Sequence, residues 1–115
     1  MNDTILGTGL ACSLRDARTL AEMLLSERDW SPAALRGYAA ERARRMRCLE
    51  RAAYIMTRLY AEFDETARMR RRRAYDLMNR NPAHSWFLAV TLAGPDVFPD
   101  GPFGDYLAER LLATA

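Results

Sequence analysis

The chain has 115 residues, about the length of one ordinary domain. Half of the residues are hydrophobic and 28% are charged, which is typical of a folded protein and excludes a disordered tail. The net charge of +2 is too small for a dedicated nucleic-acid binder.

Several residue types that enzymes and metal sites rely on are missing or rare. All seventeen basic residues are Arg, so there is no lysine for a phosphate loop, a Schiff base or a kinase site. One His and two Cys cannot supply the four ligands of a structural zinc ion. We therefore assign no metal ligand and no catalytic residue.

The sequence indicates a cytoplasmic protein that does not bind membranes. Cys12 and Cys48 fit a reducing compartment better than a disulfide framework. The first twelve residues lack a positively charged start, include Asp3 and contain two glycines, which argues against a secretion signal. The longest uncharged run, residues 81–95, is shorter than the about twenty apolar residues of a membrane helix.

The first two predicted helices cover about residues 10–26 and 32–63. In the first, apolar residues recur every three or four positions: Leu10, Leu14, Ala17, Ala21 and Leu24. Ser31 and Pro32 are a cap followed by proline at the first helical position, and they open the second. With a rise of about 1.5 Å per residue the second helix is roughly 48 Å long, which a compact bundle of this size does not easily cover.

The remaining chain is divided by caps and prolines. Asp64 caps a third helix, about 65–80, and Asn81-Pro82 opens a fourth, about 82–93, that ends at Gly94. A turn-rich link leads to a short helix at about 103–113. No segment alternates as a strand does. The prediction is an all-α chain of about five helices, one of them long, divided into 1–27, 31–63 and 64–115.

A glycine pair stands directly before the first helix, in Gly7-Thr8-Gly9-Leu10. Glycines permit close backbone approach, and a helix start offers unpaired N–H groups at the positive end of its dipole. Such a turn can hold a phosphate or an electron-rich ring edge, although Gly-x-Gly alone is more typical of a flexible loop. It is no dinucleotide fingerprint, because the third glycine and the preceding strand are missing.

The wider context carries a family resemblance. Asp16-Ala17 follows the glycine pair at a fixed distance, and Tyr38 and Arg42 form a Tyr-x-x-x-Arg pattern at the start of the long helix. These features resemble the class A FAD-dependent monooxygenases, the family of para-hydroxybenzoate hydroxylase. That family has Pro, Gln and Asn where this chain has Thr4, Thr8 and Ala11.

The resemblance implies that the glycine turn and the helix start lie against the flavin. The cofactor-binding residues it implies are Gly7, Thr8, Gly9, Leu10 and Ala11, with residues 1–27 as the flavin-proximal turn and helix. A backbone donor survives a change of side chain, so the amides of Leu10 and Ala11 remain suited to face the flavin. The fold it implies is the C-terminal helical part of an α/β FAD-binding fold.

The motifs with which this family binds the rest of FAD, and its substrate sheet, have no counterpart here. The resemblance thus implies a C-terminal fragment of an FAD- and NAD(P)H-dependent monooxygenase-like oxidoreductase, not active alone. FAD would bind only together with the missing upstream FAD-binding domain, which is the implied partner. Without that domain we expect the strip Leu10, Leu14 and Leu24 and the apolar stripe of the long helix to be exposed, which favours self-association.

A free-standing Arg-rich helical interaction module is the alternative. Arginines at 42–51 and 68–73 suggest a basic face, but acidic neighbours dilute it, which favours a solvated helical face without nucleic acid. We expect Cys12 and Cys48 to be small buried hydrophobes and His84 to be a surface or capping residue.

Overall fold

The computed structural model describes residues 7–26, 30–97 and 102–113, and within these ranges it is mostly helical, with five α-helices and no strand. The helices are α1 (Gly9–Ser26), α2 (Arg36–Met56), α3 (Glu65–Arg80), α4 (Trp86–Ala93) and α5 (Pro102–Leu112). Short 3-10 helices, η3 (Pro82–Ser85) and η4 (Pro95–Val97), flank α4. The predicted all-α fold is therefore confirmed.

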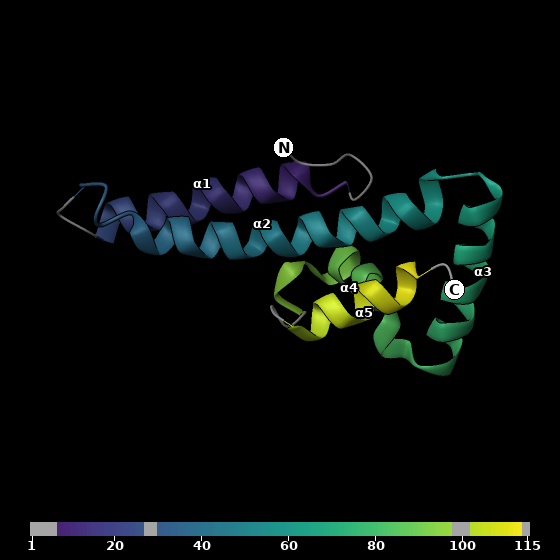
Figure 1. The fold of residues 1–115 in the computed structure, drawn as a ribbon. Coiled ribbons are helices and arrows are strands. Elements are labelled where there is room, and N and C mark those ends of the chain that lie inside the picture. Colours follow the sequence, from purple (N-terminus) through teal and green to yellow (C-terminus); the bar gives the residue numbers. More distant parts are fainter. Residues whose placement is uncertain (1–6, 27–29, 98–101, 114–115) are drawn as a thin grey trace.

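The molecule has two unlike ends. The helices α1 and α2 lie side by side and antiparallel, and they form a hairpin that projects from the rest of the chain (Figure 1). The helices α3, α4 and α5 gather around the C-terminal part of α2 (Figure 1). The molecule is consequently elongated, at 56 × 25 × 20 Å.

The long helix is shorter than predicted at both ends. Residues 32–35 form a turn that Ser31 caps through its Oγ, which accepts from the Ala34 amide at 3.4 Å. The Arg36 amide bonds the Ala33 carbonyl, three residues back, so the regular α-helix begins only at Arg36. At the other end α2 runs into a π-helical turn, η2 (Thr57–Ala61). The predicted bounds of 32 and 63 are corrected to 36 and 61.

The other boundaries follow local capping. The Asp64 side chain accepts from the Ala67 amide at 2.7 Å and opens α3 as predicted. The Asn81 side chain accepts from the Ala83 amide at 3.0 Å, but the first turn after it is η3, so α4 proper begins at Trp86. Gly94 ends α4 with a φ of +89°, a conformation that favours glycine.

The core lies where α3, α4 and α5 gather around the C-terminal part of α2, a region that we call the compact end. Its fully buried side chains come from α2, η2, α4 and α5: Ile55, Leu59, Phe87, Val90, Leu107 and Leu111. Cys12 is the one described residue of α1 that is buried. The expectation that the long-helix stripe is uncovered is therefore wrong for its C-terminal half, where α4 and α5 cover Leu49 and Ala53.

Within the described ranges, none of the helices combines the length and apolarity that a membrane crossing requires.

Candidate functional site

The five residues implied for flavin contact lie at the free start of α1. Gly7 has a φ of +64°, and a Cβ built there meets no atom within 4 Å, so conformation rather than space favours glycine. The first helical hydrogen bond runs from the Cys12 amide to the Thr8 carbonyl, at 2.9 Å. The amides of Gly9, Leu10 and Ala11 precede that bond, so they have no acceptor inside the helix and suit an electron-rich ligand.

The predicted apolar strip of α1 faces outward along its first turns. Leu10 is 74% exposed and Leu14 is 63% exposed, while Ala17 and Ala21 are also exposed. These residues recur at the spacing of one helix face, and the opposite face lies toward α2. The expected exposure is confirmed for Leu10 and Leu14, whereas Leu24 is partly buried.

The polar face of α1 is joined to α2 by ion pairs. Asp16 accepts from Arg42 Nε at 2.9 Å and from Arg45 Nη2. Glu41 accepts from Arg45 Nε at 3.2 Å and from Arg15 Nη2 at 2.9 Å. Asp16 and Arg42, which carry two separate parts of the family resemblance, are thus direct partners across the hairpin.

Asp96 in η4 extends the ion pairs to the compact end. It accepts from Arg15 Nη1 and from Arg44 Nη2, the latter at 3.1 Å. The hydrogen bond from Arg15 lowers the pKa of Asp96 below its usual range, so its carboxylate is ionised at neutral pH. Arginine and carboxylate side chains thereby fix the end of α4 against both helices of the hairpin.

Arg45 lies at the centre of these contacts and is 1% exposed. Burial lowers its pKa, but hydrogen bonds to Asp16 and Glu41 outweigh burial and raise it, so the guanidinium stays charged. Among the described residues its Nη1 atom has no hydrogen-bond partner. The expected solvated arginine face is corrected here, and also at Arg70, whose side chain is 4% exposed.

A cleft of about 260 Å³ opens between these elements. The described residues lining it include Thr8 just before α1, Ala11 and Cys12 from the first turn of α1, Arg45 and Leu49 from α2, Thr91 from α4 and Pro95 from η4. We call it the α1–α4 cleft. Two of the residues implied for the cofactor, Thr8 and Ala11, line it, whereas Leu10 lies on the exposed strip.

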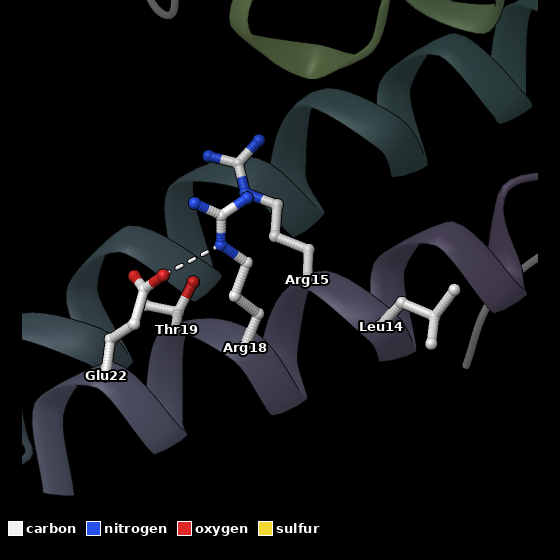
Figure 2. A pocket seen from close by; sticks show the side chains of 5 residues that line it. All are labelled: Leu14, Arg15, Arg18, Thr19 and Glu22. Atoms are coloured by element: carbon white, nitrogen blue, oxygen red, sulfur yellow. Dashed lines mark hydrogen bonds and ion pairs between the residues drawn. The ribbon is translucent and has the colours of Figure 1, made fainter. Parts of the chain in front are cut away.

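A second, more open hollow of about 560 Å³ runs along α1, lined by Leu14, Arg15, Arg18, Thr19 and Glu22. Figure 2 shows these side chains on successive turns, with Leu14 directed away from the arginines. Arg18 Nε donates to Glu22 at 2.8 Å, and both side chains are largely exposed (Figure 2). Its charges are paired and screened by water, so it is the weaker candidate for a ligand site.

The remaining residues singled out in the sequence are structural. Cys12 and Cys48 are buried thiols that are not joined in a disulfide, as predicted. His84 is buried, and its Nδ1 lies 3.2 Å from the Asn81 carbonyl, which corrects the expectation of a surface residue. Across the described ranges no three His, Cys, Asp or Glu side chains gather as a metal site needs.

Sequence reasoning missed Glu41, Arg45 and Asp96 as parts of one site. The spacing of Glu41 and Arg45, four residues apart on one helix, is a signal of pairing. Asp96 carries no such signal, because its partners are at least fifty residues away along the chain.

No family model, curated protein or solved structure matches the chain.

Proposed function

We propose that the chain is the C-terminal helical segment of an FAD-dependent monooxygenase-like oxidoreductase and contributes backbone contacts to the flavin. One observation carries this proposal. The two stretches that resemble class A monooxygenases, at the glycine turn with Asp16 and at Tyr38 with Arg42, are joined by the 2.9 Å ion pair between Asp16 and Arg42. A direct contact between the two stretches is what one shared family site would require.

The start of α1 suits the edge of a flavin ring. The amides of Gly9, Leu10 and Ala11, which have no acceptor within the helix, stand at the positive end of an 18-residue helix. The exposed Leu10 and Leu14 side chains give an apolar surface beside them. When bound, FAD would supply the redox chemistry, with NAD(P)H as the reductant in the intact family.

The implied partner is the FAD-binding domain, and the exposed strip of α1 is the surface we assign to it. The ion pairs to α2 occupy the polar face of α1 and leave Leu10 and Leu14 without cover from the described residues. An apolar strip of this kind favours a partner protein or self-association.

The chain by itself should bind FAD weakly or not at all. Each backbone donor contributes about 1 kcal/mol net, and the helix dipole adds about 1 kcal/mol at most. Immobilising a large flexible cofactor costs several kcal/mol. Contacts from an FAD-binding domain are needed to offset that cost.

The test is a flavin titration followed by fluorescence, on the chain alone and on the chain fused behind an FAD-binding domain of the family it resembles. We expect yellow, flavin-loaded protein only from the fusion. In the fusion, Gly9→Val should lose flavin because a β-branched side chain blocks close approach. Gly37→Val is the matched control, since a Cβ at Gly37 meets no atom within 4 Å.

Two results would contradict the proposal. One is tight FAD binding by the chain alone, and the other is unchanged binding in the fused Gly9→Val variant. The DNA gives a further test: an open frame ending in Gly-Asp-Ala directly upstream favours the proposal, whereas a promoter and ribosome site there favours the free-standing interaction module.

A further inference from the structure

We propose that Arg15 is a positioning residue for the flavin contact. Its guanidinium holds the start of α1, and with it the amides of Gly9, Leu10 and Ala11, against α2 and η4. This inference rests on the proposed function and extends it to a side chain that does not itself touch the flavin.

Arg15 joins three elements through one guanidinium. Its Nη2 atom donates to Glu41 of α2 at 2.9 Å, and its Nη1 atom donates to Asp96 of η4. These two partners lie 26 and 81 residues farther along the chain. Asp96 also accepts from Arg44 Nη2 at 3.1 Å, so this acceptor is itself tied to α2. A shift of α1 relative to either neighbour breaks at least one of these contacts.

The first charged side chain of α1 is Arg15. Residues 9–14 carry no charge, and among them only Cys12 is buried. The Ser13 hydroxyl donates to the Gly9 carbonyl of its own helix at 3.1 Å. Asp16, which follows Arg15, accepts from arginines that both belong to α2. Arg15 is therefore the residue that ties the start of α1 to η4 as well as to α2.

The helix transmits the position of Arg15 to the amides. Four to six residues separate it from Ala11 and Gly9, which is about 6–9 Å at about 1.5 Å per residue. The helical hydrogen bonds begin between the Cys12 amide and the Thr8 carbonyl, at 2.9 Å, so the segment between is regular helix. Backbone donors hold an acceptor only at about 2.7–3.2 Å. A shift of about 1 Å at the helix start is enough to lose a flavin contact.

The surroundings of Arg15 favour positioning over a direct bond to the phosphates of FAD. Two carboxylates, on Glu41 and Asp96, already accept from its guanidinium. The hydrogen bond to Asp96 raises the pKa of Arg15 above its ordinary value, as expected for a cation held by an anion. A phosphate placed there would meet both negative groups at close range.

The first experiment follows amide hydrogen exchange by NMR in the 115-residue chain without flavin. In Arg15→Gln the amide of Cys12 should exchange at least about threefold faster, because the start of α1 has lost its ties to α2 and η4. Arg18→Gln is the matched control. Arg18 pairs with Glu22 of its own helix, so its loss should leave the exchange of Cys12 unchanged (Figure 2).

The second experiment uses the fusion with an FAD-binding domain. Arg15→Gln should raise the dissociation constant of FAD about threefold to tenfold. It should also lower the midpoint potential of the bound flavin, because displaced amides stabilise the negative charge of the reduced ring less well. A general loss of folding stability would not move this potential. Arg18→Gln should leave both the dissociation constant and the potential unchanged.

The two experiments separate this inference from the proposed function. If the unmodified fusion binds no FAD, the proposed function is wrong and the inference falls with it. If the unmodified fusion binds FAD but Arg15→Gln leaves either the exchange of Cys12 or the flavin potential unchanged, only the inference is wrong. Equal changes in Arg18→Gln would overturn it in the same way.

Discussion

The hairpin and the compact end of this molecule are held together by different forces. Across the hairpin α1 meets α2 through ion pairs around Asp16 and Glu41, and among the described residues of α1 Cys12 alone is buried. At the compact end, fully buried apolar residues such as Phe87 and Leu111 join α2 to α4 and α5. Exposed ion pairs contribute about 0–1 kcal/mol each, whereas burying one large apolar side chain contributes about 1.5–3 kcal/mol. The hairpin is therefore the weaker half, and it is also the half in which the apolar strip of Leu10 and Leu14 is exposed.

The largest loss of folding stability is expected when a core side chain is truncated. Phe87 is 0% exposed, so Phe87→Ala should lower the free energy of unfolding by about 3–5 kcal/mol through lost burial and the cavity that remains. Phe63→Ala is the matched control, because Phe63 is 72% exposed and should lose about 0.5 kcal/mol or less. Urea denaturation measures both, and similar losses at the two positions would contradict an apolar core at the compact end.

A smaller loss of folding stability is expected when Arg45, at the centre of the ion pairs, is replaced. Arg45→Met leaves Asp16 and Glu41 without their buried partner and should destabilise the chain by about 2–3 kcal/mol, less than a wholly buried pair because both carboxylates are partly exposed. The same substitution at Arg18, whose ion pair with Glu22 is exposed, should leave the denaturation midpoint unchanged. Equal midpoints for Arg45→Met and the unmodified chain would show that this contact is not holding the hairpin.

The exposed strip should control self-association. Replacing both Leu10 and Leu14 with Ser removes apolar surface worth about 1.5 kcal/mol or more per residue when buried, so association should weaken at least about tenfold. Leu92→Ser, at an equally exposed leucine on α4, should change it little. Light scattering over a range of concentrations provides the measurement. A monomer at high concentration in the unmodified chain would contradict the role of this strip.

The smallest effect is a loosening of the hairpin by acid. Burial raises the pKa of Asp16, but hydrogen bonds from Arg45 and Arg42 outweigh burial and lower it below its ordinary value of 3.8. A lowered carboxyl pKa stabilises the fold fully above its unfolded value, and that stabilisation is lost as the pH falls through the folded value.

Hydrogen-exchange protection of α1 should thus decline below about pH 4 while that of α4 is retained. Asp16→Asn removes the titrating group and should make α1 protection less dependent on pH. Parallel loss of protection in both helices would mean that the hairpin and the core do not differ in this way.

The sequence predicted those features that depend on near neighbours. The caps at Asp64 and Asn81 bond amides two or three residues away, so the starts they mark could be recognised from short motifs. The sequence predicts α-helix directly after Ser31, where the structure has a turn. A capping residue followed by proline can precede either an α-helix or such a turn. In these cases the error was no more than four residues.

The candidate site depended on distant neighbours and was predicted only in part. The glycine turn and its helix start could be singled out because they lie together in the sequence, and their contact with a flavin stays a prediction. The burial of Arg45 could not be predicted, because it depends on Asp16 from another helix and on the end of α4 closing over the same region. From the sequence alone, an arginine on a charged helix is expected to be exposed, because the elements that cover it are not known.

The corner between α2 and α3 has a consequence for the order of folding. Arg71 of α3 donates to the carbonyls of Leu59 and Glu62, and Arg70 donates to the carbonyl of Arg58. The carbonyls of Arg58 and Leu59 belong to the last turn of the long helix, and that of Glu62 follows it directly, where no further turn supplies a donor. The final turn of the long helix is thus completed by the helix that follows it, so the two form as one cooperative unit rather than in sequence.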